Sequence, residues 1–189
     1  SAKLFRTSTQ AKDNYVDFVK YVSSFQENGE FGKATSTLLI MDEITAIVYF
    51  NGSEETIVKV DAAAPYTDYT IKIVKPSQCS GEKNCLCLFR KADFDATWWK
   101  PGYDVITVLP NRVICTNLDY NLELESCSIG TPTGINSYIC TQGFMIERSL
   151  AKESSWGTSS YYENPRRRTV YLKHFGDTIR IEGVVAANE

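Results

Sequence analysis

The stretch Thr37-Leu-Leu-Ile-Met-Asp-Glu-Ile-Thr-Ala-Ile-Val-Tyr-Phe50 contains two runs of aliphatic and aromatic residues, separated by the acidic pair Asp42-Glu43. Short apolar runs bounded by turn residues are typical of buried strands, so this stretch predicts strands at residues 37–41 and 44–50. The following Asn51-Gly52-Ser53 predicts a second tight turn, because asparagine and glycine tolerate the positive φ angles of hairpin turns. A third strand at residues 56–60 would complete an antiparallel meander.

The same pattern continues to the end of the chain. Further β-rich runs lie at residues 69–74, 85–90, 105–109, 112–116, 121–125, 144–149, 169–173 and 178–184. Several of them alternate polar and apolar residues, as half-buried antiparallel strands do. No helical pattern separates the strands, which argues against a parallel α/β fold. The sequence therefore predicts a mainly β protein, an antiparallel β-sandwich or barrel.

An amphipathic helix precedes these strands. Apolar side chains recur there at helical spacing and form one stripe: Tyr15, Phe18, Val19, Val22 and Phe25. Asn28-Gly29 should end the helix, since both residues tolerate a left-handed conformation. We expect residues 1–30 to form this helix and residues 31–189 a disulfide-stapled β-rich domain, with one structural domain overall. The stripe should pack on the sheet of its own chain or on a neighbouring subunit, because an isolated helix of this length is marginal in water.

The middle of the chain contains all six cysteines: Cys79, Cys85, Cys87, Cys115, Cys127 and Cys140. An even number of cysteines without a C-x-x-C unit, in a chain with one histidine, favours disulfide bonds formed in an oxidising compartment. A thiolate metal site is one alternative. Free buried thiols are the other, and they would suit a cytosolic protein.

The pair Cys85 and Cys87 constrains the disulfide pattern. Residues two apart on a strand point to the same face, so these cysteines should bond to different partners. Among the connectivities that six cysteines allow, we predict Cys79–Cys85, Cys87–Cys115 and Cys127–Cys140.

Charge and motifs argue against several functional classes. A net charge of −3 and a pI near 5.3 disfavour nucleic-acid binding, which needs a basic surface. No apolar run approaches the roughly 20 residues of a transmembrane helix. The chain has no nucleophile elbow, dinucleotide fingerprint or phosphate loop, and its single histidine, His174, is expected at the edge of a turn. We therefore predict no catalytic, cofactor-binding or metal-binding residues and no enzymatic activity.

Two long segments between the predicted strands are rich in aromatic side chains. They contain the candidate partner-binding residues Trp98, Trp99, Trp156, Tyr161 and Tyr162. Indole and phenol rings combine a large apolar area with one polar group, which suits contacts with glycans or with other proteins. The triplet Asn51-Gly52-Ser53 also fits an N-glycosylation acceptor, which would be used only in an exported protein.

The N-terminal helix, the strand pair 37–50, the centre Cys85-Leu-Cys-Leu88 and the β-rich tail together resemble uncharacterised archaeal surface proteins. Those proteins carry an N-terminal membrane or pilin-like helix followed by a cysteine-containing, β-rich ectodomain. The resemblance implies a hydrophobic segment before residue 1, through which alone the protein would meet a membrane. It assigns no enzymatic activity to named residues.

The expected function follows from location and from the lack of catalytic motifs. We expect an extracellular or cell-surface structural or adhesive subunit, self-assembling into a filament or surface layer, whose partners are other copies of itself or another surface protein. The alternatives are a membrane-anchored module that binds a glycan or a protein and, third, an uncharacterised hydrolase. Assembly would use exposed strand edges, with the chain ends 1–9 and 179–189 as strand donors.

Overall fold

A computed structural model describes residues 2–41, 46–65, 67–89, 105–110, 113–124, 135–147 and 166–186. The chain divides into two compact units. Unit 1 comprises Ser1–Glu43, Tyr120–Ser126 and Thr158–Glu189, and unit 2 comprises Ile44–Asp119 and Cys127–Gly157. The expectation of one structural domain, with a helix of residues 1–30 and a β-rich part of residues 31–189, stays a prediction.

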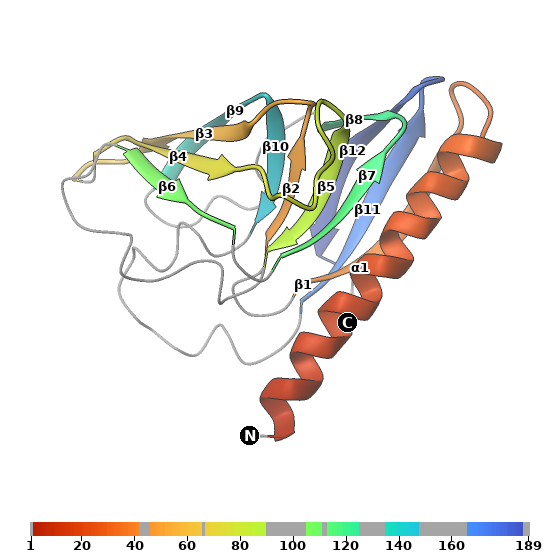
Figure 1. The fold of residues 1–189 in the computed structure, drawn as a ribbon, viewed down its shortest axis with the longest axis horizontal. Coiled ribbons are helices and arrows are strands. Elements are labelled where there is room, and N and C mark those ends of the chain that lie inside the picture. The colour runs from red at the N-terminus through yellow and green to blue at the C-terminus, as the bar shows by residue number, and fades with distance from the viewer. Residues whose placement is uncertain are drawn as a thin grey trace. The chain divides into compact units, whose positions relative to one another are not determined.

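Unit 1 is a long helix on a four-stranded sheet (Figure 1). The helix α1 spans Ala2–Asn28. The strands, in sheet order, are β1 (Ala34–Met41), β11 (Arg166–His174), β12 (Thr178–Ala186) and β8 (Asn121–Leu124). β11 pairs antiparallel with β1 and β12, whereas β12 pairs parallel with β8.

The predicted apolar stripe of α1 packs within unit 1. Tyr15, Phe18, Val19 and Val22 are buried, and so are sheet residues on one face, such as Leu39, Val170, Leu172, Ile179 and Ile181. Polar contacts mark the path of the helix. The Tyr21 hydroxyl lies 2.6 Å from Oγ1 of Thr35 on β1, and Ser23 Oγ lies 2.9 Å from the hydroxyl of Tyr120, the residue before β8. α1 therefore runs along β1 and comes near the start of β8 close to its own C-terminal end, and the prediction of a packed stripe is confirmed.

The end of α1 requires a glycine, because the chain comes close to β11 there. A Cβ atom at Gly29 would lie 2.8 Å from Cδ2 of His174 and would also collide with the carbonyl oxygen of Phe25. The predicted helix end at Asn28-Gly29 is confirmed. The close approach of Phe25 and His174 accounts for the glycine, and not a left-handed conformation, since Gly29 does not have a positive φ.

Unit 2 contains two four-stranded sheets. One has the order β10 (Gly143–Glu147), β2 (Ala46–Phe50), β5 (Asn84–Phe89) and β7 (Ile114–Leu118). The other has the order β6 (Val105–Val108), β4 (Tyr69–Val74), β3 (Glu55–Ala62) and β9 (Ile135–Thr141). Side chains from both sheets form one core, which includes Val48, Phe50, Val58, Ile71, Ile73, Cys85, Cys87 and Phe89. Unit 2 is therefore sandwich-like, and the predicted mainly β fold with an N-terminal helix is confirmed.

The predicted meander through residues 37–60 is wrong. β1, β2 and β3 lie in three different sheets and do not pair with one another. All five residues of β2 are buried, which suits a central strand covered on both faces, whereas β1 alternates exposed and partly buried residues along its first half. Adjacent runs in the sequence predicted the strands but not their partners.

One further strand and two parallel pairings were missed. β9 begins with Ile135, followed by the polar residues Asn136 and Ser137, and was not among the predicted strands. Both polar side chains bind the carboxylate of Asp61 on β3, at 3.2 and 3.3 Å. The pairs β8–β12 and β4–β6 are parallel, although the sheets are otherwise antiparallel.

Candidate functional site

The predicted strand with two cysteines is β5, and it carries two disulfide bonds. Cys85 is bonded to Cys79, in the segment that precedes β5, and Cys87 is bonded to Cys115 on β7. Cys87 and Cys115 are direct cross-strand partners in the β5–β7 ladder. The prediction that Cys85 and Cys87 have different partners is confirmed, as are these two predicted pairs.

The third predicted pair is only partly covered. Cys140 on β9 is also disulfide-bonded. Its predicted partner, Cys127, lies outside the described residues.

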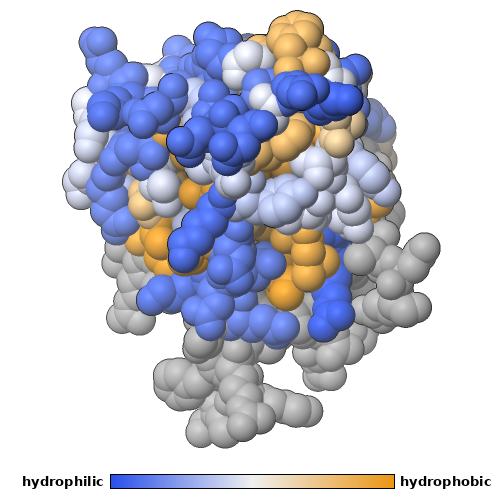
Figure 2. Space-filling view, turned by 90° about the vertical axis from the view of Figure 1, so that its right-hand side faces the viewer, coloured by the Kyte–Doolittle hydropathy of each residue, from blue (hydrophilic) through white to orange (hydrophobic). Residues whose placement is uncertain are grey.

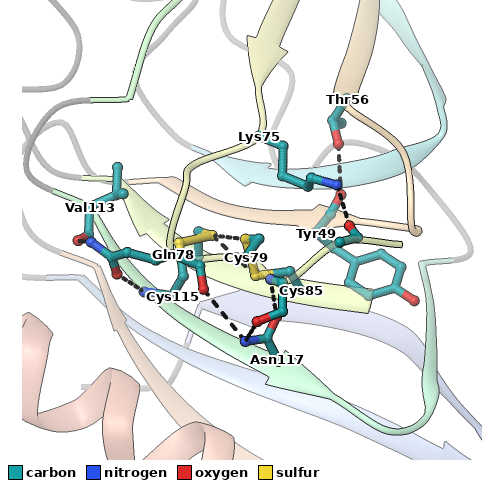
Figure 3. The surroundings of a disulfide bond; sticks show 12 residues. Tyr49, Thr56, Lys75, Gln78, Cys79, Cys85, Val113, Cys115 and Asn117 are labelled. Atoms are coloured by element: carbon teal, nitrogen blue, oxygen red, sulfur yellow. Dashed lines mark hydrogen bonds between the residues drawn. A yellow bond between two sulfur atoms is a disulfide. The ribbon is translucent and has the colours of Figure 1, made fainter. Parts of the chain in front are cut away.

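The two disulfides touch each other in the core of unit 2 (Figure 3). Sγ of Cys87 lies 3.5 Å from Sγ of Cys79 and 3.8 Å from Sγ of Cys85. All four sulfur atoms of Cys79, Cys85, Cys87 and Cys115 lie within 4.8 Å of one another. Cys79, Cys85 and Cys87 are buried, and Cys115 is partly exposed. We call these four residues the sulfur cluster.

Side-chain amides hold the segment that carries Cys79 on β7. Gln78 accepts a hydrogen bond from the backbone N–H of Cys115 at 3.1 Å and donates one to the carbonyl of Val113 at 2.8 Å. Asn117 accepts from the backbone N–H of Ser80 at 2.8 Å and donates to Ser80 Oγ at 3.2 Å. These bonds fix the segment independently of the disulfides (Figure 3). We call Gln78 and Asn117 the amide clamp.

A lysine ties the loop between Cys79 and Cys85 to the start of β3. Lys75 Nζ donates to the carbonyl of Gly81 at 2.6 Å and to Glu54 Oε1 at 2.9 Å. The lysine side chain is only 5% exposed, whereas that of Glu54 is 88% exposed. The ammonium group therefore lies buried against the loop, while its carboxylate partner faces solvent.

The disulfides indicate an oxidising environment outside the cytoplasm, because thiols are kept reduced in the cytosol. Among the helices that the structure describes, none is long and apolar enough to cross a membrane.

The five predicted partner-binding aromatics, Trp98, Trp99, Trp156, Tyr161 and Tyr162, lie outside the described residues. The glycosylation triplet is described, and Asn51 is exposed in the turn between β2 and β3. Ser53 Oγ donates a hydrogen bond to the carbonyl of Asn51 at 3.1 Å.

An open apolar surface in unit 1 was not predicted. On the sheet face opposite the buried residues, Leu38, Thr169 and Val185 lie in one cross-strand row on β1, β11 and β12. Leu38 and Val185 are 40% and 47% exposed, and Tyr171, two residues along β11 from Thr169, is 46% exposed. Tyr171 leans over β12, where a Cβ on Gly183 would lie 3.9 Å from its ring. We call Leu38, Thr169, Tyr171 and Val185 the open face.

Charged groups continue the open face toward β8. A second cross-strand row lies beside the first and consists of Lys173 on β11, Arg180 on β12 and Glu123 on β8. Arg180 pairs with Glu123 at 3.3 Å and lies over the ring of Phe175, 4.4 Å from its centroid. The alternation in Thr169-Val-Tyr-Leu-Lys173 could have indicated this surface, because its polar and aromatic residues share one face of a strand.

The free edge of β1 is partly closed by the helix. The side-chain amide of Asn14 donates to the carbonyl of Leu38 at 3.3 Å and accepts from the backbone N–H of Ile40 at 2.6 Å. A residue of a parallel neighbouring strand would bind the same two groups, on either side of Leu39. Asn14 therefore substitutes for a strand at this edge.

Two buried titratable side chains join α1 to the sheet. His174 Nε2 donates to the carbonyl of Gln26 at 2.8 Å, and Nδ1 accepts from the backbone N–H of Gly176 at 3.1 Å, which requires the neutral Nε2–H tautomer. Both ring nitrogens are thus used by backbone groups. Burial raises the pKa of Tyr120, and its hydrogen bond with Ser23 opposes this shift.

Comparison with known proteins gives no relative. No protein-family model, no curated protein and no solved structure matches the chain.

Proposed function

We propose that the protein is a non-enzymatic structural or adhesive subunit that works at the cell surface and self-associates through the open face of unit 1. The observation that carries the proposal is the continuous row Leu38–Thr169–Val185 with Tyr171 beside it, on a sheet whose other face is buried. Grouped apolar side chains on an exposed sheet face are typical of protein interfaces. The disulfide-held core of unit 2 suits a protein that works in an oxidising medium.

The charged row beside the apolar one supports contact between identical copies. Lys173, Arg180 and Glu123 present both signs of charge within three neighbouring strands. A two-fold contact between two open faces can therefore set the carboxylate of one copy against a cation of the other while the apolar rows meet.

Assembly through strand edges, which the sequence suggested, is less well supported. Residues 179–186 belong to β12, which is paired on both sides with β11 and β8 and buries Ile179 and Ile181. Removing this segment would dismantle the sheet, so it is not a free strand donor. Residues 2–9 are part of α1, and Asn14 occupies one position of the β1 edge. The proposed contact is therefore face to face.

The test compares two charge insertions. Val185→Glu places a carboxylate on the open face, at the β12 end of the row, whereas Ile139→Glu changes an aliphatic residue on β9 of unit 2 that is even more exposed. Sedimentation over a wide concentration range should show self-association for the parent protein and for Ile139→Glu, and at least a tenfold weaker association for Val185→Glu. A parent protein that stays monomeric at high concentration would overturn the proposal and favour the membrane-anchored binding module.

A further inference from the structure

We propose that the sulfur cluster, when its two disulfides are reduced, is a four-cysteine site for one Zn²⁺ ion or a similarly thiophilic divalent cation. The ligands would be the thiolates of Cys79, Cys85, Cys87 and Cys115, whose sulfur atoms converge within 4.8 Å. Four thiolates are a common ligand set for structural zinc.

Two of the distances between the disulfides already match a tetrahedral site. With Zn–S bonds of about 2.3 Å, the sulfur atoms of a regular tetrahedron are about 3.8 Å apart. Cys87 Sγ lies 3.5 Å from Cys79 Sγ and 3.8 Å from Cys85 Sγ. After reduction, only the two bonded sulfur pairs would have to separate, and both can do so by side-chain rotation.

The four cysteines stay together without the disulfides. Cys85 and Cys87 share one face of β5, and the β5–β7 ladder holds Cys115 opposite Cys87. The amide clamp binds the segment of Cys79 to β7 through Gln78 and Asn117. Because backbone pairing and side-chain amides set this arrangement, reduction leaves a preorganised ligand set. Most zinc sites can be recognised in a sequence by pairs of ligands that lie close together. Here the ligands come from three segments, so the spacing of the cysteines did not indicate a zinc site.

A cation binds the loop that joins two of the ligands. A zinc ion with four thiolates carries two negative charges, which are costly to bury without compensation. The buried ammonium group of Lys75 lies on the carbonyl of Gly81, in the loop between Cys79 and Cys85. Partial exposure of Cys115 gives solvent and a cation access to the cluster.

The chemistry balances with a thiol or phosphine as the reductant. Each disulfide takes up two electrons and two protons and gives two thiols, while two dithiol molecules become cyclic disulfides, or two phosphines become phosphine oxides with oxygen from water. Binding of the cation then releases four protons from the four thiols. In a cell, the cysteines are thiols when the chain is made, before it is oxidised. Metal binding and disulfide formation are therefore alternative ways to link the same four cysteines in the core.

The experiment uses the full chain, reduced with a phosphine that is then removed without oxygen. Titration with Co²⁺ should saturate at one ion per chain and give the absorption of a tetrahedral cobalt–thiolate centre, and one equivalent of Zn²⁺ should abolish that absorption. With Zn²⁺ bound, mass spectrometry should show at least tenfold slower alkylation of the four ligands, Cys79, Cys85, Cys87 and Cys115, than of Cys140.

Two variants serve as matched controls. Cys115→Ser removes the partly exposed ligand and should weaken cobalt binding at least a hundredfold, whereas Cys140→Ser should keep one ion per chain with the same spectrum. A parent protein that binds no Co²⁺ after reduction, including one that unfolds and stays unfolded with Zn²⁺, would overturn the proposal. Protection of a different set of cysteines would overturn it as well.

Discussion

The two units of the molecule hold their sheets together in different ways. In unit 2, two adjacent disulfides join β5 to β7 and to the segment before β5, inside a core shared by two sheets. In unit 1, one sheet is covered by α1, and hydrogen bonds of Asn14, Ser23 and His174 fix the helix on it. The cysteines that the structure describes all belong to unit 2. Covalent links thus stabilise one unit and helix packing the other.

This difference separates two requirements on the molecule. Unit 2 gains resistance to unfolding from links that act mainly on the unfolded chain. Unit 1 instead presents the open face. The strands that carry this face are held in place by the packing of α1 on the other face of the sheet. The face that Figure 2 shows is mostly hydrophilic, with its apolar side chains in smaller groups.

The largest effect is expected from Phe18→Asp, which tests the dependence of unit 1 on helix packing. Phe18 is 2% exposed on the buried side of α1. Loss of the ring and burial of a carboxylate should lower the free energy of unfolding by about 4 kcal/mol or more. Chemical denaturation followed by circular dichroism measures this change.

Val16→Asp is the control for the helix substitution. Val16 is 37% exposed on the same helix, so this change should cost less than about 1 kcal/mol. Equal losses for the two variants would show that the stripe does not hold α1 on the sheet.

The next effect concerns the two disulfides of unit 2. Cys87–Cys115 closes 28 residues and Cys79–Cys85 closes 6. The chain-entropy relation gives about 3.6 kcal/mol for the longer loop and about 2.2 kcal/mol for the shorter one. The double variant Cys87→Ala with Cys115→Ala should therefore be less stable than Cys79→Ala with Cys85→Ala, by about 1.4 kcal/mol in urea unfolding. The reverse order would show that local packing, not loop closure, sets the stability of unit 2.

The sequence predicted local structure well and the pairing of distant strands poorly. The same-face rule for Cys85 and Cys87 depends on strand geometry alone, so it required no knowledge of the sheets. The partners of β1 could not be predicted, because its register with β11 joins residues 34–41 to residues 166–173, far apart in the chain. Strand propensity contains no information on such distant pairing.

The candidate surfaces divide in the same way. The candidate aromatic residues stood out by composition, whereas the open face consists of ordinary strand residues, which are Leu38, Thr169, Tyr171 and Val185. They form a surface only because three strands align in register. The sulfur cluster likewise depends on the β5–β7 ladder and the amide clamp, which no spacing of cysteines encodes.

A smaller effect is expected at the edge of β1. Asn14→Ala removes two hydrogen bonds to the backbone beside Leu39 and should lower the free energy of unfolding by about 1–2 kcal/mol. It also exposes a carbonyl and an N–H on a strand edge, so sedimentation should show stronger association than in the parent protein.

Gln10→Ala is the matched control for Asn14→Ala. Gln10 is an exposed amide one helical turn earlier, and its loss should change neither stability nor association. Unchanged association of Asn14→Ala, together with unchanged stability, would contradict the idea that Asn14 substitutes for a strand.

The smallest effect concerns pH and the contact between α1 and Tyr120. Burial raises the pKa of Tyr120 above its ordinary value, so the neutral phenol is favoured in the folded protein. Its contribution to stability is fully present below about pH 10 and is lost as the pH rises through the folded pKa.

The free energy of unfolding should therefore fall at alkaline pH in the parent protein, and this fall should be smaller in Tyr120→Phe. Ser23→Ala removes the hydrogen bond that opposes the shift, so the fall should extend to higher pH and become larger. Tyr21→Phe, which changes an exposed tyrosine of the same helix, should keep the parent profile. Identical alkaline profiles for the parent protein and Tyr120→Phe would show that the buried phenol does not link α1 to the sheet energetically.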